Sequence, residues 1–327
     1  MTMRTLILVV LFAFATANAA LSRPDNTVPS GESTTELYNK GKALHLQERY
    51  AEAIVYLRRA AEQGSAAAQS DLGSCYYYGE GVPKSYSEAL RWFRKAAEQG
   101  HAHAQYSIGW QYYYGQGVTQ NYREAVAWYG KAAAQGDADA QYKLGDCHYY
   151  GNGVPRNYYE AVEWYRKAAE QGSVDAQYKL GNSYYCGRGV PKDYAEAVKW
   201  YRKSAEQGNK FVQNQLGDCY YNGNGVEVNY SEAVRWYGMA ADGGCAIAQN
   251  NLGVCYQNGE GVRRDDCEAV YWFYRAAEQG NPIAQYNLGQ CFEYGQGVAE
   301  SAESARLWYG KAAEQGHEKA KARLQQM

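Results

Sequence analysis

LGSCYYYGEGVPKSYSEALRWFRKAAEQG, residues 72–100, decides the fold, because the chain repeats this stretch with a fixed period of 36 residues. Leu72-Gly73 returns at each period until Leu288-Gly289, once as Ile108-Gly109, and Trp92 returns at each period until Trp308. A fixed period of about 20–50 residues is typical of a solenoid, in which units too small to bury a core alone stack on their neighbours. The period therefore excludes most compact enzyme folds and predicts a one-dimensional array.

The first half of each copy is predicted to be a helix. In the copy at residues 101–136, Ala104, Ile108 and Tyr112 recur at a spacing of four, and this stripe is expected to face the second helix of the same copy. A residue whose side chain accepts hydrogen bonds from the free amides of a first helical turn precedes the stripe in most copies. These predicted N-caps are Ser65, His101, Asp137, Ser173, Asn209 and Asn281.

The second half is predicted to be a loop followed by another helix. In Gly115-Gln116-Gly117 both glycines permit the positive φ of a tight turn, which ends the first helix. The second helix passes through Trp128 and ends at Gly136. We expect alanine and glycine at the helix contacts to allow close approach, and the tryptophan to fill the space between the helices.

Both ends of the array differ from the seven regular copies at residues 65–316. Residues 33–64 form a shorter unit, with 12 residues from Gly41 to Ala53 where later copies have 16, and without the Gly-x-Gly loop. Residues 317–327 keep two apolar repeat positions but are otherwise polar, and they predict a terminal capping helix.

The consensus LGxxYYxGxGVxxxYxEAxxWYxKAAEQG resembles the Sel1-like repeat, a relative of the tetratricopeptide repeat, over residues 66–316. Residues 33–64 resemble a tetratricopeptide repeat in the spacing of their glycine, tyrosine and alanine residues. The resemblance implies an all-α, right-handed solenoid of helix–loop–helix repeats: one tetratricopeptide-like unit, seven Sel1-like repeats and a capping helix. It also implies an adaptor role, because members of the family tune envelope signalling, bind host proteins or assist degradation complexes.

The first residues predict export. A basic residue, Arg4, precedes an apolar run and an Ala-x-Ala site ending at Ala19, so residues 1–19 resemble a secretory signal peptide. The run is too short for a permanent membrane anchor. Residues 20–32 have no periodicity and are predicted to be a flexible leader. We therefore expect a periplasmic or secreted protein, or one in the lumen of the endoplasmic reticulum if the source is eukaryotic.

The sequence shows no catalytic constellation. The net charge of −2 argues against a general nucleic-acid binder. G-x-S-x-G, S-x-x-K, H-E-x-x-H and C-x-x-C motifs are absent, and the Gly-x-Gly turns lack the lysine of a phosphate loop. His101 and His103 lie two apart on a helix and so point to different faces. No catalytic residue, cofactor or metal site is predicted.

The spacing of the eight cysteines does not predict a definite set of disulfides. Five share one repeat position: Cys75, Cys147, Cys219, Cys255 and Cys291. Equivalent positions on packed helices lie about 8–10 Å apart or more, which exceeds the Cα separation of about 7 Å that a disulfide allows. Cys255 with Cys267 is the pairing left open, and otherwise buried, reduced thiols are expected. The chain also resembles the cysteine-rich Helicobacter branch of the family, but it lacks that branch's cysteine pair in each repeat.

A second stripe on the first helices is the candidate binding surface. In tetratricopeptide repeats the corresponding positions line a concave groove, and tyrosine and tryptophan are enriched at binding hot spots. The alternative is that these rings pack against the first helix of the next unit. Trp110 breaks the repeat pattern and is the strongest single candidate. The residues of the predicted groove are Tyr77, Tyr106, Trp110, Tyr113, Tyr142, Tyr149, Tyr178, Tyr185 and Tyr221.

These observations favour an exported, non-enzymatic scaffold that binds a protein or peptide partner in this groove, without nucleic acid and without an integral membrane anchor. The alternative, implied by the cysteine-rich branch, is a weak penicillin-binding or β-lactamase-like enzyme. A purely structural envelope component is the third possibility.

Overall fold

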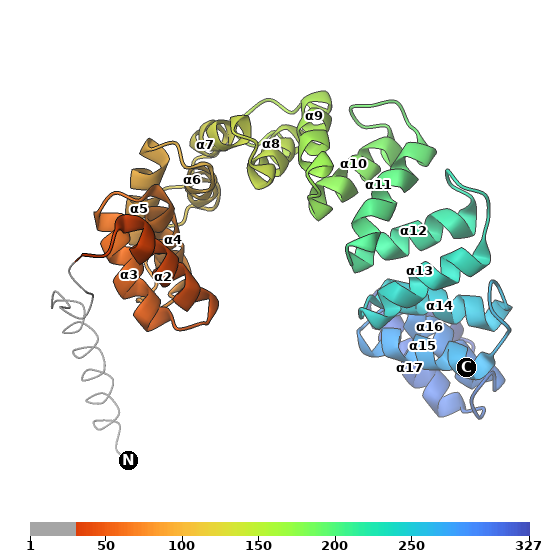
Figure 1. The fold of residues 1–327 in the computed structure, drawn as a ribbon. Coiled ribbons are helices and arrows are strands. Elements are labelled where there is room, and N and C mark those ends of the chain that lie inside the picture. The colour runs from red at the N-terminus through yellow and green to blue at the C-terminus, as the bar shows by residue number, and fades with distance from the viewer. Residues whose placement is uncertain (1–30) are drawn as a thin grey trace, which may run out of the picture. The chain divides into compact units, whose positions relative to one another are not determined.

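A computed structural model describes residues 31–327 (Figure 1), so the predicted signal peptide and most of the predicted leader lie outside the described residues. Every regular element in residues 31–327 is an α-helix, and all but the last span 13 residues. The helices are α2 (Thr34–Leu46), α3 (Tyr50–Glu62), α4 (Ala66–Tyr78), α5 (Tyr86–Glu98), α6 (Ala102–Tyr114), α7 (Tyr122–Ala134), α8 (Ala138–Tyr150), α9 (Tyr158–Glu170), α10 (Val174–Cys186), α11 (Tyr194–Glu206), α12 (Lys210–Asn222), α13 (Tyr230–Asp242), α14 (Ala246–Asn258), α15 (Asp266–Glu278), α16 (Pro282–Tyr294), α17 (Ala302–Glu314) and α18 (Glu318–Leu324).

Consecutive helices pair into hairpins, α2 with α3, α4 with α5 and so on to α16 with α17, and α18 follows as a single short helix. The chain divides into two blocks, an N-terminal block that ends at Gln135 and a C-terminal block that begins at Gly136. Within each block the second helix of one hairpin packs against the first helix of the next. This arrangement is the predicted all-α solenoid of repeated hairpins.

The helix ends follow the residues that the repeat supplies. All six predicted N-caps accept a backbone N–H, as when Ser65 accepts from Ala68 at 3.2 Å. Cys245, which was not predicted as a cap, occupies the same position before α14 and makes no capping bond. The second helices from α5 onward are capped too, by residues that the sequence analysis did not single out: Ser85, Asn121, Asn157, Asp193, Asn229, Asp265 and Ser301.

The two glycines of each loop have the positive φ that their positions predict. Gly115 ends α6 with φ of 69°, and Gly117 continues the turn with φ of 71°. A Cβ at Gly117 would also lie 2.8 Å from the carbonyl carbon of Tyr86, the first residue of α5. The second glycine of the loop therefore serves both the turn and the contact with the preceding hairpin.

The helix-to-helix contact within a hairpin differs in one respect from expectation. The side chain opposite the first-helix glycine belongs to the residue after the tryptophan: a Cβ at Gly109 would lie 2.6 Å from the Tyr129 ring, and one at Gly181 would lie 2.6 Å from the Tyr201 ring. Tyr129 and Tyr201 are fully buried, whereas Trp128 is only half-buried under Lys131. The aromatic after the tryptophan therefore packs directly on the glycine, and the tryptophan packs beside it between the helices, where Trp92, Trp236 and Trp308 are buried.

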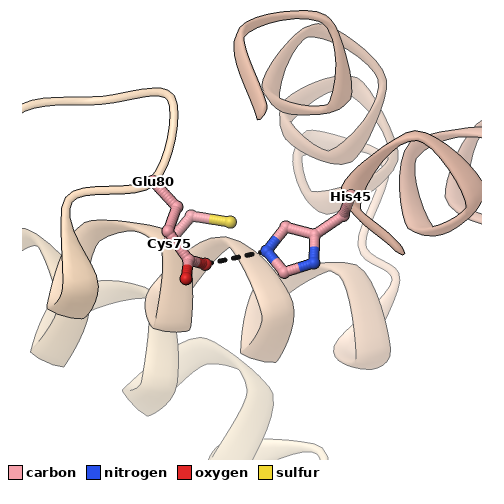
Figure 2. A group of neighbouring side chains, drawn as sticks. All are labelled: His45, Cys75 and Glu80. Atoms are coloured by element: carbon pink, nitrogen blue, oxygen red, sulfur yellow. Dashed lines mark hydrogen bonds and ion pairs between the residues drawn. The ribbon is translucent and has the colours of Figure 1, made fainter. Parts of the chain in front are cut away.

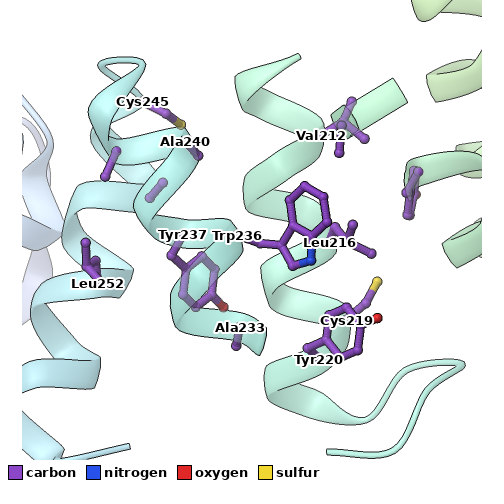
Figure 3. Close-up of a cluster of buried hydrophobic side chains, with 14 of the residues drawn as sticks. Val212, Leu216, Cys219, Tyr220, Ala233, Trp236, Tyr237, Ala240, Cys245 and Leu252 are labelled. Atoms are coloured by element: carbon purple, nitrogen blue, oxygen red, sulfur yellow. The ribbon is translucent and has the colours of Figure 1, made fainter. Parts of the chain in front are cut away.

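In the C-terminal block the largest buried cluster spans three hairpins around α12, α13 and α14 (Figure 3). Trp236 points toward Val212 and Leu216 of α12, while Tyr237 lies between α12 and α14. Each second helix thus contributes adjacent aromatic residues to the contacts on its two sides. This double use explains why so short a unit is stable only within an array.

Candidate functional site

A cavity of about 290 Å³ lies in the N-terminal block between α4 and α6. Three of its lining residues, Tyr77, Tyr106 and Trp110, belong to the predicted groove. Its remaining lining is a mixture of aromatic and small polar side chains: Ser74, Tyr78, Phe93, His103 and Ser107. The cavity forms because small serines on both helices leave room between the larger rings.

Trp110 is the central residue among those that line the cavity. Its indole N–H donates to the Tyr77 hydroxyl at 3.0 Å, and that hydroxyl donates to Oε1 of Gln116 at 2.6 Å. The Trp110 ring lies 6.0 Å from the Tyr106 ring and 4.5 Å from the Tyr114 ring. Burial raises the pKa of Tyr77, so its hydroxyl stays protonated as a donor. The hydrogen bonds fix the indole while its face borders the cavity.

Trp110 departs from what the same repeat position does in the next three hairpins. There, a short polar side chain accepts from the buried tyrosine of the second helix: Asp146 from Tyr165 at 2.8 Å, and Asn182 from Tyr201 at 2.6 Å. Asp218 accepts from the equivalent tyrosine at 2.7 Å. These residues satisfy a buried hydroxyl, whereas Trp110 instead reaches Tyr77 of the preceding hairpin.

The tyrosines at the positions of Tyr113, Tyr149, Tyr185 and Tyr221 are half-buried and contact their own hairpin. Each packs edge-on against the first residue of the following helix, with ring centroids 4.8–5.2 Å apart. Three of them also bond through the hydroxyl to the turn of the next hairpin: Tyr149 with Arg188, Tyr185 with Asn224 and Tyr221 with Glu260.

Tyr106, Tyr142 and Tyr178 form a second half-buried column. Their rings lie 5.7, 6.0 and 6.4 Å from the buried tyrosines of their own hairpins, Tyr129, Tyr165 and Tyr201. The structure therefore brings Tyr77, Tyr106 and Trp110 together around a cavity and gives the other predicted residues hairpin contacts. Their role in partner binding stays a prediction.

All eight cysteines are free. Cys186 and Cys267 are exposed and the other six are buried. Burial raises the pKa of Cys75, Cys147, Cys219 and Cys255 to about 12 and that of Cys291 to about 11. Without a bound metal ion, the thiols at the repeated cysteine position are therefore buried and neutral, as expected, and Cys255 does not pair with Cys267.

A cluster that the sequence analysis missed lies between the first two hairpins, where His45, Cys75 and Glu80 meet (Figure 2). These residues lie up to 35 positions apart, and the shorter first unit shifts His45 out of the 36-residue register. No motif of fixed spacing could reveal them.

The Sel1 repeat family model matches residues 36–65, 66–101, 102–137, 138–173, 174–209, 211–245, 246–281 and 282–317, and the chain therefore belongs to the Sel1 repeat family. Among solved structures it is similar to a protective antigen present in uropathogenic Escherichia coli strains that displays an SLR fold. The identity is 38%, the TM-score is 0.82, and the match covers 90% of this chain and 67% of the other. A Sel1 repeat protein from Oxalobacter formigenes is 36% identical with a TM-score of 0.64, over 73% of this chain and 96% of the other. A comparison with curated proteins found no match.

Repeats of this kind generally mediate protein–protein interaction. Over residues 31–327, no helix has the length and apolar character needed to cross a membrane.

Proposed function

We propose that the protein is an exported, non-enzymatic scaffold that holds a segment of a partner protein against the predicted groove. In this proposal the cavity between α4 and α6 receives one large apolar or aromatic side chain of the partner. The cavity of about 290 Å³ is the observation that carries the proposal. It is at the lower end of the size range of ligand pockets, about 300–1,000 Å³, which suits a single side chain better than a cofactor.

The chemistry of the wall supports this use. Rigid aromatic rings with polar edges give a large contact area at little cost in conformational entropy, which is why tyrosine and tryptophan dominate binding hot spots. Trp110 is already held by its hydrogen bond to Tyr77, so the site is preorganised. Export rests on the predicted signal peptide at residues 1–19.

The test replaces Trp110 with the residue of a later copy. Trp110→Asn introduces the side chain found at Asn182, where it accepts from the buried tyrosine of its hairpin, so the fold is expected to survive. Tyr159→Asn is the matched control, since Tyr159 is 62% exposed and does not line the cavity. Crosslinking in the native compartment identifies the captured protein, and its affinity for each purified variant is then measured.

We expect Trp110→Asn to weaken capture at least tenfold with an unchanged helical content and melting temperature, and Tyr159→Asn to leave capture unchanged. If Trp110→Asn and Tyr106→Ala each bind the partner with the same affinity as the native chain, the proposal is refuted. The enzymatic alternative has a separate test, because hydrolysis of nitrocefin by the purified protein would support it. The buried cysteine column is a poor source of a nucleophile for such chemistry, since its thiols stay protonated.

A further inference from the structure

The cluster of His45, Cys75 and Glu80 combines three metal-ligating chemistries at one junction. His45 lies in the last turn of α2, Cys75 lies in α4, and Glu80 lies in the turn that follows α4. One ligand atom from each residue lies within 4.8 Å of the other two. Figure 2 shows the sulfur and the carboxylate pointing toward the imidazole ring, whose Nε2 lies 2.8 Å from Oε2 of Glu80.

The repeat itself supplies the comparison that makes this cluster unusual. His45 is the twelfth residue of its 13-residue helix, the position of Tyr77 in α4 and Tyr221 in α12. Its ring packs edge-on against the first residue of the following helix, Tyr50, at 5.1 Å, just as Tyr77 packs against Tyr86 at 5.1 Å. His45 is thus a histidine placed where five of the seven regular repeats carry a tyrosine hydroxyl.

The two partners of His45 also follow the repeat pattern. The Cys75 position is a cysteine in most later copies but a glutamine or serine in two, and the Glu80 position is a glutamate again only at Glu260. At that second junction, Tyr221 donates to Glu260 at 2.7 Å, and Cys255 is buried nearby in α14. The two junctions share their cysteine and their glutamate and differ in the histidine.

We propose that His45, Cys75 and Glu80 form a binding site for one zinc ion that joins the first two hairpins. Thiolate sulfur, imidazole nitrogen and carboxylate oxygen are the three ligand types that zinc takes from proteins. Tetrahedral coordination at bond lengths of about 2.0–2.3 Å places the ligand atoms about 3.3–3.8 Å from one another.

The site reaches this geometry by small side-chain movements. The imidazole and carboxylate, now 2.8 Å apart, separate slightly as the ion enters between them, and the wider pairs within the 4.8 Å limit close by about 1 Å. The side chains of His45 and Glu80 are 34% and 30% exposed, so they can move and the ion has access from solvent. The fourth coordination position is open to water.

The site lies between the first two hairpins that the structure describes. An ion that binds the folded junction stabilises it by mass action. Zinc would therefore hold the α2–α3 hairpin against α4. This proposal does not depend on partner capture, because the cluster does not line the cavity between α4 and α6.

Zinc binding is measured on the full mature chain in which Cys186→Ser and Cys267→Ser remove the exposed thiols. After treatment with a chelator, titration with zinc chloride against a chromophoric competitor gives stoichiometry and affinity, and Co²⁺ reports a thiolate ligand through its charge-transfer absorption. We expect one equivalent per chain, with loss of the cobalt charge-transfer band in Cys75→Ser. Amide exchange in α2 and α3 should slow about tenfold when free zinc is ten times its dissociation constant.

Two variants exchange the histidine between the junctions. His45→Tyr restores the residue of the regular repeats, with its bond to the glutamate, and should abolish zinc binding at this site while keeping the helical content. Tyr221→His completes a second cluster with Cys255 and Glu260 and should raise the stoichiometry from one to two. Absence of zinc binding by the native chain, or binding that survives in both Cys75→Ser and His45→Tyr, would overturn the proposal.

Discussion

The packing of the first-helix glycine on the buried tyrosine makes a quantitative prediction. Gly109 and Gly130 lie in the two helices of one hairpin, α6 and α7, yet their surroundings differ. A Cβ at Gly109 would lie 2.6 and 2.7 Å from ring carbons of Tyr129 and 3.2 Å from the carbonyl oxygen of Ala125. A Cβ at Gly130 would meet nothing within 4 Å. The same substitution should therefore have opposite effects at the two positions.

The magnitudes follow from two opposing terms. Alanine stabilises a helix interior relative to glycine by about 1 kcal/mol, and only this term acts in Gly130→Ala. Forcing an extra methyl group into a packed core costs about 1–3 kcal/mol. Tyr129 is fully buried and the Ala125 carbonyl is backbone, so neither moves easily, and the upper part of that range applies to Gly109→Ala. We expect a net loss of about 1–2 kcal/mol there and a gain of about 0.5–1 kcal/mol in Gly130→Ala.

Amide hydrogen exchange read peptide by peptide is the suitable assay, because a repeat array does not unfold as one two-state unit. Exchange in α6 and α7 should accelerate about tenfold in Gly109→Ala, since 1.4 kcal/mol corresponds to a factor of ten, and should slow in Gly130→Ala. Tyr129→Leu, which makes room for the methyl group, should reduce the cost of Gly109→Ala in a double-mutant cycle. If both alanine variants stabilise the hairpin equally, the glycine is not required by the tyrosine ring and the packing argument is wrong.

Two further predictions concern the end of the array and the thiols. Glu293 accepts from Arg323 of α18, and Arg323, with the Tyr309 hydroxyl, holds the pKa of Glu293 below its ordinary value. The stabilisation that Glu293 gives α18 is therefore complete above the unfolded glutamate pKa of about 4.3 and is lost as the pH falls through the lower folded pKa. Amide exchange in α18, corrected for its intrinsic pH dependence, should therefore accelerate in acid, and Glu293→Gln should remove this acceleration. Cys186 and Cys267 are exposed and should react with a thiol reagent in a first fast phase, whereas the six buried cysteines should react only after denaturation. Mass spectrometry of the labelled peptides measures both phases. Fast labelling of Cys147 in the native chain would contradict the burial of the cysteine column.

The repeat period, the helix caps and the turn glycines could be predicted from the sequence because they depend on local chemistry. Gly115 needs a positive φ and Ser65 caps its own helix, whatever surrounds them. Contacts between hairpins could not be predicted in the same way. The bond from Tyr77 to Gln116 joins residues 39 apart, and the cavity beside Trp110 depends on how α4 and α6 are spaced. Such distances follow from the rise and turn between hairpins, which a repeat period does not encode.

The side chain at the twelfth position of each first helix connects its hairpin to the next one. Its polar tip reaches the turn of the next hairpin from His45, Tyr77, Tyr185 and Tyr221, and from Gln257 to Gln296 at 3.2 Å. In α16 this position is Glu293, which accepts from Arg323 of α18.

Variation at this column therefore follows the residue that each side chain must meet in the next hairpin, and the tyrosine hydroxyls are already bonded within the chain. In the proposed function, a partner would meet the ring faces of these residues rather than free hydroxyls, and such contacts would discriminate little between partner sequences. Trp110 differs, because no turn residue requires an indole at its position and because its ring borders a cavity. In the proposed function, discrimination between partners is expected to depend on that cavity, where an incoming side chain can be selected by shape.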